Sequence, residues 1–269
     1  MNYFGNFFKG IIIGIGNIAP GVSGGALAMI LGLYEDMVSA VGNFFKNMKR
    51  NLIFLFPIGL GAAIGIVGFS NILSYLLEKL PMPTTYTFAG LIVGTLPLLV
   101  KRANRRGFKV TYLIPFVLTL ITGLTLAFLE TGFGDIQAGA LHSVNLFQLV
   151  FGGFVLAGSI VIPGISGSVL LMLLGFYESF LRAVASLDLV ILFPMGIGLA
   201  VGVLVFAKFM DYLLREYYGI TYYAVLGFVI GAIPEIITGY SFDWLGLVSV
   251  FCFFGGLAIS YALSRLERL

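Results

Sequence analysis

Hydrophobic residues along this chain form long continuous runs, without the alternation that is typical of a half-buried strand. Six of these runs approach or exceed the length of about 20 residues that a helix needs to cross a membrane. They cover about 52–77, 85–100, 111–129, 190–213, 221–238 and 244–263. A membrane β-barrel would instead show alternating segments of about 10 residues, so the pattern predicts membrane-spanning helices.

Two further apolar segments, at about 8–41 and 146–184, are each interrupted by a Pro-Gly pair. Proline cannot donate a helix hydrogen bond and glycine tolerates a tight turn, so each pair is expected to end one helical arm. The arms Gly10–Ala19 and Ser23–Leu33 would each be about 15 Å long, half of the hydrocarbon core. Each segment is therefore predicted to be a re-entrant hairpin that turns near the midplane. The predicted turn residues are Pro20, Gly21, Pro163 and Gly164.

The two hairpin segments belong to an internal repeat. Pro20–Val41 and Pro163–Val184 are identical at twelve of 22 positions, at an offset of 143 residues. The similarity continues at an offset of 137 through the spans that follow. We therefore expect one integral membrane domain over 1–269, with repeat one at about 1–130 and repeat two at about 142–269.

Lysine and arginine predict how the two repeats are oriented, because short cytoplasmic loops carry an excess of them. If each hairpin returns to the side on which it began, thirteen of the 15 basic residues face the cytoplasm and only Lys79 and Arg182 face outside. A single crossing by each hairpin would put the basic loop Lys101–Lys109 outside, against this rule.

Three net crossings per repeat then place repeat two upside down relative to repeat one, as in many secondary transporters. The predicted fold is an all-α membrane protein with an inverted-topology repeat, in which each half is a re-entrant helical hairpin plus three transmembrane helices. Both termini are expected in the cytoplasm, and no signal peptide is expected because Met1–Lys9 lacks a basic segment and a cleavage site.

The composition excludes a soluble enzyme. Hydrophobic residues make up 59% of the chain and charged residues only 10%, whereas soluble domains carry about 25% charged residues. The net charge of +3 is distributed by loop and gives no indication of nucleic-acid binding. With one cysteine, Cys252, and one histidine, no disulfide, metal site or cofactor is expected.

Two inverted hairpins would aim the helices that begin at Ser23 and Ser166 toward a common point near the midplane. Helix N-termini carry partial positive charge and free N–H groups, which suit an anion and above all phosphate. The alternative is that these small residues only allow close helix packing. The candidate phosphate-binding residues are Ser23, Gly24, Gly25, Ser166, Gly167 and Ser168, with Arg182 to recruit the anion from outside.

Glu35 and Glu178 follow the same tyrosine in the two repeats and are candidates for proton coupling. An ordinary glutamate at the membrane boundary is the alternative for both. Glu178 has Arg182 one helical turn later, whereas the equivalent residue in repeat one is Ser39. Glu35 is therefore the better candidate for a group that binds and releases protons.

An enzyme is the less favoured interpretation. The segments Gly21–Gly24 and Gly164–Gly167 match a G-x-S-G pattern like that of an intramembrane serine protease. A serine nucleophile needs a base, and His142, the only histidine, lies in the predicted external connection. One histidine there could not serve two sites on inverted hairpins.

The paired segments IAPGVSGGALAMILGLYE and VIPGISGSVLLMLLGFYE resemble the polyprenyl-phosphate transporter family (PopT), bacterial membrane proteins formerly catalogued as a domain of unknown function. The likeness covers nearly the whole chain and includes the basic central loop. It implies translocation of undecaprenyl phosphate from the outer to the inner leaflet of the bacterial plasma membrane, for reuse in cell-wall synthesis.

Proton coupling is a further expectation, because inward movement of negative charge opposes an inside-negative potential by about 2.3 kcal/mol per charge per 100 mV. The expected partners are the polyprenyl phosphate, protons and membrane lipid, and the sequence leaves the oligomeric state open. An anion channel or an anion/proton exchanger with its site at helix ends remains the alternative function.

Overall fold

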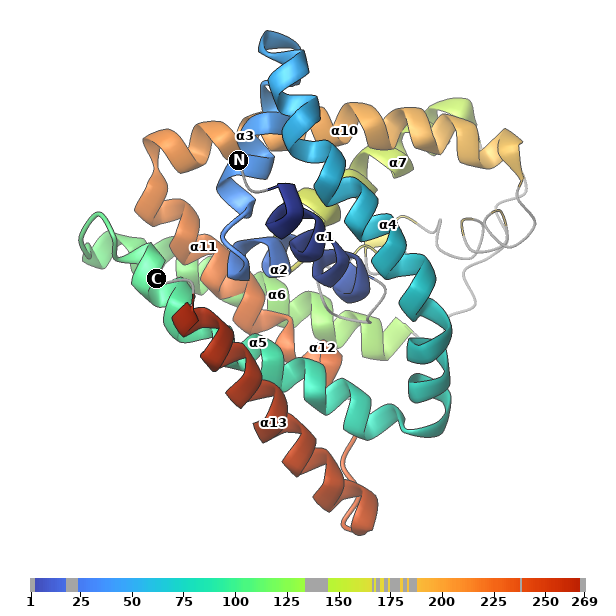
Figure 1. The fold of residues 1–269 in the computed structure, drawn as a ribbon, viewed down its shortest axis with the longest axis vertical. Helices are drawn as coiled ribbons and strands as arrows, with labels where there is room; N and C mark the ends of the chain where they lie inside the picture. Colours follow the sequence, from blue (N-terminus) through green and yellow to red (C-terminus); the bar gives the residue numbers. More distant parts are fainter. Residues whose placement is uncertain are drawn as a thin grey trace.

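The computed structural model consists of helices and short connections (Figure 1). It describes residues 3–17, 24–133, 145–165, 167, 170, 171, 174, 180, 183, 188–237 and 239–266. No strand occurs among these residues. The α-helices are α1 (Tyr3–Asn17), α2 (Gly24–Ile30), α3 (Tyr34–Gly42), α4 (Met48–Lys79), α5 (Pro81–Ala103), α6 (Leu113–Phe133), α7 (Leu146–Val161), α10 (Leu189–Glu216), α11 (Tyr218–Gly231), α12 (Ile233–Ile236) and α13 (Trp244–Leu266). Two short 3-10 helices are η1 (Phe44–Lys46) and η2 (Val110–Tyr112).

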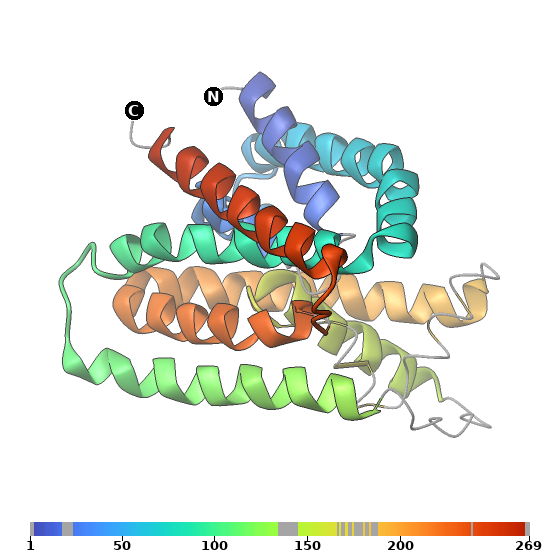
Figure 2. The same cartoon turned by 90° about the horizontal axis from the view of Figure 1, so that it is seen from below.

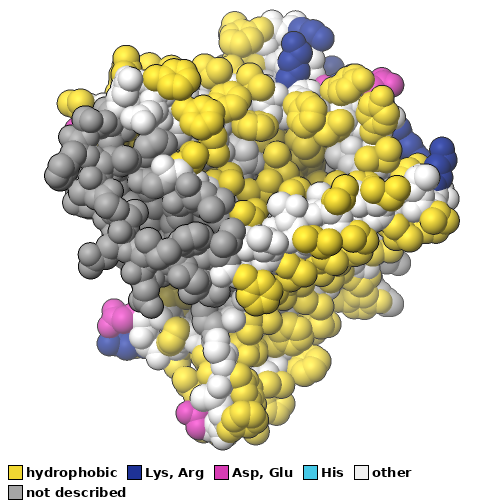
Figure 3. Space-filling model, turned by 180° about the vertical axis from the view of Figure 1, so that it is seen from behind, with side chains coloured by type: hydrophobic (Ala, Val, Ile, Leu, Met, Phe, Trp, Pro, Cys, Tyr) yellow, Lys and Arg dark blue, Asp and Glu magenta, His cyan; other side chains and the backbone are white. Residues whose placement is uncertain are grey.

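Five helical segments are long and apolar enough to cross a membrane, and they correspond to five of the six predicted spans. They are Met48–Lys79, Pro81–Ala103, Val110–Phe128, Leu189–Glu216 and Trp244–Ala262. Apolar side chains also cover much of the described part of the face seen in Figure 3, where the lysine and arginine side chains that are drawn lie near its edge. The protein is thus an all-α, multi-pass membrane protein.

The sixth predicted span, 221–238, differs from the prediction. Helix α11 has only 14 residues, about 21 Å, and ends at Gly231. The four-residue helix α12 follows, with Pro234 in its first turn. Because proline has no N–H to donate to the carbonyl of Ile230, helix α11 does not continue as one long rod.

The first hairpin segment also differs from the predicted pair of arms. The second arm is not one helix over Ser23–Leu33, because α2 has seven residues and the chain turns at Gly32, where φ is 69°. This positive φ favours glycine. Lys9 of α1 donates a hydrogen bond of 2.7 Å to the carbonyl of Leu31 at this break. Glu35 therefore lies in the first turn of a separate helix, α3, and not at the far end of a long arm.

Helices α1 and α4 pack backbone to backbone and run in the same direction. A Cβ atom added at Gly10 would overlap the carbonyl of Ile58, and one at Gly14 would overlap the carbonyl of Ala62. The contact advances by four residues along both helices, so the two helices are parallel. The segment between α1 and α4 therefore returns to the level at which α1 begins.

Helices α7 and α10 repeat this arrangement at the equivalent positions. A Cβ atom at Gly153 would overlap the carbonyl of Met195, and one at Gly202 would lie 2.6 Å from the Cβ atom of Ala157, so the contact advances in the same direction along both helices. Gly153 and Met195 are the counterparts of Gly10 and Ile58 at the offsets of 143 and 137 residues. The same glycine contact therefore joins the first helix of each repeat to its first long helix.

The later helices of the two repeats pack against each other. Helix α5 lies beside α13 and runs parallel to it, since Gly90 faces the carbonyl of Phe253 and Gly94 faces that of Leu257. Figure 2 shows α5 and α6 running in opposite directions, joined by the loop at the left, with α13 directed as α5 is.

Helices α11 and α6 make the reciprocal contact. Gly227 faces the carbonyl of Phe116, and Gly231 faces that of Leu120. These four residues are the counterparts of the α5 and α13 residues at the offset of 137. Each repeat therefore supplies one glycine-lined helix to the other repeat.

Candidate functional site

A buried hydrogen bond connects a tyrosine of the first hairpin segment to the end of α7. The hydroxyl of Tyr34 donates to the carbonyl oxygen of Val161 over 2.8 Å, across 127 residues of sequence. Tyr34 is only 2% exposed. Val161 is the last residue of α7 and comes directly before the second predicted turn. The two hairpin segments are therefore in direct contact.

A cavity of about 160 Å³ lies at this contact. Both repeats line it, with residues from α1, α2, α3, α7 and α10: Ile13, Gly24, Gly25, Ala28, Tyr34, Met37, Val38, Val41, Ile160, Val161, Val203 and Ala207. Apart from the hydroxyl of Tyr34, these side chains are apolar. The structure thus brings two candidate phosphate-binding residues, Gly24 and Gly25, to the same cavity as the end of α7.

The second predicted turn is formed by Pro163 and Gly164. Helix α7 ends at Val161, Pro163 is fully buried, and Gly164 has φ of 85°. A Cβ atom at Gly164 would lie 2.7 Å from the backbone nitrogen of Val229 in α11. Glycine at this position therefore allows both the turn and a close approach to α11.

Gly167 packs tightly against α7. A Cβ atom there would lie 2.7 Å from the hydroxyl oxygen of Ser159 and 2.9 Å from a methyl carbon of Leu156. This contact gives Gly167 a packing role, which was the alternative to phosphate binding. Several predicted site residues lie outside the described part of the chain and remain predictions: Pro20, Gly21, Ser23, Ser166, Ser168, Glu178 and Arg182.

Glu35 lies at the interface between the repeats. Its carboxylate accepts hydrogen bonds from the hydroxyls of Tyr222, at 2.5 Å, and Tyr218, at 3.2 Å. Both tyrosines are buried and lie one turn apart on α11. This partnership could not be predicted from the sequence, because 183 and 187 residues separate the partners and no motif marks the tyrosines.

The carboxylate is part of a larger polar cluster. The guanidinium of Arg106 lies over the ring of Tyr218, 4.6 Å from its centre, and also donates to the carbonyl of Arg215. The equivalents of the two tyrosines in repeat one are Pro81 and Thr85, which have no phenol hydroxyl. Repeat one therefore offers no equivalent pair of tyrosine hydroxyls, and proton coupling through Glu35 or Glu178 stays a prediction.

Comparison with known proteins gives consistent matches over most of the chain. A polyprenyl-phosphate transporter of Staphylococcus aureus (strain NCTC 8325 / PS 47) is 29% identical over 274 residues, covering 97% of this chain and 96% of the relative. A polyprenyl-phosphate transporter of Vibrio cholerae serotype O1 (strain ATCC 39315 / El Tor Inaba N16961) is 28% identical over 250 residues, covering 88% of this chain and 78% of the relative.

No solved structure gives a significant match to the chain. Both curated relatives carry the name of a transporter and not of an enzyme. Residues 13–244 match the family described as VCA0040-like, undecaprenyl phosphate translocase-like. This match covers most of the chain, from within the first hairpin segment to the start of α13, and the chain therefore belongs to the undecaprenyl phosphate translocase-like family.

Proposed function

We propose that this protein moves undecaprenyl phosphate, or a related polyprenyl phosphate, from the outer to the inner leaflet of the bacterial plasma membrane, where the lipid is reused in cell-wall synthesis. The family match and the names of the two relatives support the substrate. The structural observation that carries the proposal is the meeting of both hairpin segments at one interior cavity, marked by the hydrogen bond from Tyr34 to Val161.

The two repeats are related by inversion across the membrane in this proposal, with both termini in the cytoplasm. Support comes from helix direction: α5 runs parallel to α13, the counterpart of α6, whereas α5 and α6 are antiparallel. If the two repeats had the same orientation, α13 would run parallel to α6 and therefore antiparallel to α5. The parallel pairs α1 with α4 and α7 with α10 support hairpins that return to the side where they began.

The phosphate headgroup follows the seam between the hairpin segments while the isoprenoid tail stays in lipid. A charged group cannot cross hydrocarbon unaided, so it needs donors near the midplane. Ser23, Gly24 and Gly25 of repeat one, together with Ser166, Gly167 and Ser168 of repeat two, supply backbone and hydroxyl donors. Arg182 recruits the headgroup from outside, and rocking of one repeat against the other gives alternating access.

Proton coupling through Glu35 offsets the electrical work of moving a negative charge inward. Its support is the pair of tyrosine hydroxyls from α11 that hold the carboxylate at the repeat interface. A proton on Glu35 would turn a hydrogen-bond acceptor into a donor at this interface. Protonation can thereby change the contact between the repeats during the transport cycle.

The test is leaflet-resolved transport of undecaprenyl phosphate in liposomes that contain the purified protein. We expect wild-type protein to move the lipid and Ser23→Ala combined with Ser166→Ala to slow it strongly. Ser70→Ala, which removes a hydroxyl that donates to the nearby Val67 carbonyl, is the matched control and should transport normally. Halide currents without lipid movement would favour the anion channel and overturn the proposal.

A further inference from the structure

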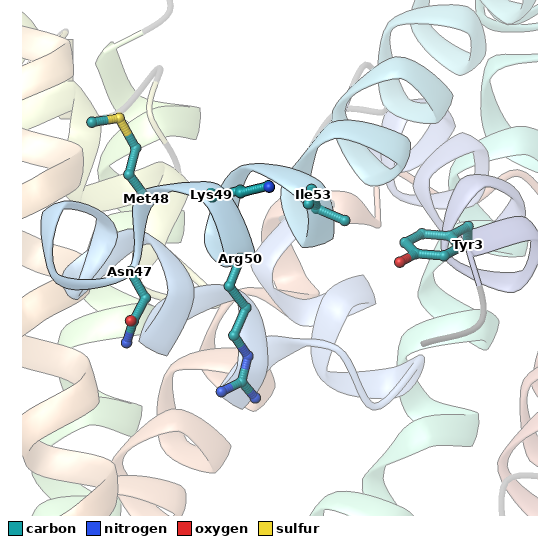
Figure 4. Close-up of a pocket in the computed structure, with 6 residues that line it drawn as sticks. All are labelled: Tyr3, Asn47, Met48, Lys49, Arg50 and Ile53. Carbon is teal, nitrogen blue, oxygen red and sulfur yellow. The ribbon is translucent and has the colours of Figure 1, made fainter.

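Two hollows lie on either side of the chain segment that joins η1 to α4. The first has a volume of about 490 Å³ and the second about 470 Å³. Asn47 and Arg50 line both of them, so this segment is their common wall. Figure 4 shows the residues that line the second hollow: Lys49 extends toward Ile53, Arg50 points in a different direction, and Tyr3 lies on a separate helix.

The first hollow is polar and has an excess of positive charge. Three cations line it, Lys46, Arg50 and Arg215, against one lining carboxylate, Asp36. Among the described residues, only Arg215 of these cations has an ion-pair partner: it lies 3.1 Å from Asp211 of its own helix. Lys46 and Arg50 are exposed and keep their charges available for an anion.

Hydrogen bonds fix the walls of this first hollow before any ligand arrives. Asn43 donates to the carboxylate of Asp211 over 2.8 Å, and Asn51 donates to the carbonyl of Asn43 over 2.9 Å. Arg215 also donates to the hydroxyl of Ser39 over 2.9 Å. The hollow is thus assembled from α3, α4 and α10 with fixed polar walls, and the exposed Lys46 and Arg50 supply the positive charge that suits a phosphate group.

The second hollow combines positive charge with exposed apolar side chains. Lys49 and Arg50 supply the charge, while Tyr3, Met48 and Ile53 are 53%, 53% and 40% exposed. A free phosphate ion would gain nothing from these apolar groups. A lipid phosphate would place its headgroup at the cations and the start of its chain against the apolar side chains.

We propose that these two hollows together form a binding site for the phosphate headgroup of a lipid, separate from the hairpin cavity. The inference rests on the proposed function and deepens it, since this would be a docking place for the lipid at the end of its path. Repeat two has no basic residue in the corresponding, six-residue shorter connection, so its sequence offers no equivalent group of cations at the other end of the path. By the distribution of basic residues that end is the cytoplasmic one.

Equilibrium binding of a polyprenyl monophosphate to the full-length protein in phosphatidylcholine nanodiscs tests this site, with inorganic phosphate as competitor. We expect Arg50→Gln to weaken lipid binding about tenfold, since hydrogen bonds to charged groups are among the stronger ones. Lys46→Gln should weaken it less. The matched control is Lys109→Gln, which removes one exposed charge of the same repeat that lines neither hollow, and its affinity should stay within about twofold of wild type.

Each outcome separates this inference from the proposed function. Equal loss of affinity in Arg50→Gln and Lys109→Gln would show a general effect of surface charge and overturn the site. Unchanged affinity in folded Arg50→Gln and Lys46→Gln proteins, with normal transport, would overturn the site and leave the function intact. Competition by inorganic phosphate at equal concentration would overturn the assignment to lipid. Binding that depends on Arg50 in a protein that moves no lipid would retain the site and refute the function.

Discussion

The hydroxyl of Tyr34 in α3 donates a hydrogen bond to the main-chain carbonyl of Val161 at the end of α7. The carbonyl belongs to the last turn of a helix, where no further helical N–H group is available to satisfy it. A side chain of repeat one therefore completes a helix end in repeat two. This bond lies at the wall of the cavity where the two hairpin segments meet.

Replacing Tyr34 with phenylalanine should destabilise the protein and slow transport. The substitution keeps the ring but leaves a buried carbonyl without its donor, which costs about 1–3 kcal/mol. Thermal unfolding of the purified protein in detergent measures the loss. Tyr75→Phe is the control, because Tyr75 is 61% exposed, and its midpoint should not change. An unchanged midpoint for Tyr34→Phe would mean that the hydrogen bond contributes nothing to stability.

Two glycines that are two residues apart on α10 should respond in opposite ways to alanine. A Cβ atom at Gly198 would overlap the backbone of Val150 in α7, so Gly198→Ala should destabilise the protein by about 1–3 kcal/mol. A Cβ atom at Gly196 meets nothing within 4 Å. Gly196→Ala should therefore be neutral or stabilising, since alanine favours a helix. Thermal unfolding distinguishes the two, and equal midpoints would refute the packing of α7 on α10.

Glu35→Gln should remove the effect of a pH gradient on transport. The amide keeps the shape of the side chain but cannot bind and release a proton. Transport is measured in liposomes with and without an inside-acidic or inside-alkaline gradient. Glu78→Gln is the matched control, because Glu78 is exposed and pairs with its neighbour Lys79. A Glu35→Gln protein that still responds fully to the gradient would exclude this residue as the coupling group.

Single cysteines should report opposite sides of the membrane for two connections of the chain. In a Cys252→Ser background, Phe108→Cys in the exposed loop after α5 should react only from the cytoplasm. His142→Cys, in the connection between the repeats, should react only from outside. Labelling of intact cells with a membrane-impermeant thiol reagent provides the measurement. Reaction of both cysteines from one side would contradict the inverted arrangement.

Most long helices could be predicted from hydrophobic pattern alone, because hydrocarbon leaves a chain few alternatives to a continuous helix. The break between α2 and α3 was harder to predict. Gly32 sits within an apolar stretch that is compatible with a helix, and only its backbone conformation, with φ of 69°, ends α2. The predicted length of the second arm was wrong for this reason.

The partners of the candidate residues could not be predicted, because they depend on which helices become neighbours. Nothing in the spacing of Tyr218 and Tyr222 connects them to Glu35, since the contact arises from the packing of α3 and α11. The hollow around Arg50 likewise could not be predicted, because it forms only where α10 packs so that Arg215 lines the same hollow as Lys46 of η1. Sequence repeats identified the two halves of the molecule but not the side chains that join them.

The exchange of helices between the halves has a consequence for synthesis. When translation has reached about residue 130, α5 and α6 lack their main partners, because the faces that pack on α13 and α11 have no neighbour yet. These faces are therefore exposed to lipid or to other membrane proteins until the rest of the polypeptide is inserted. If the two halves were expressed as separate polypeptides, the fragments would have to associate before they are degraded.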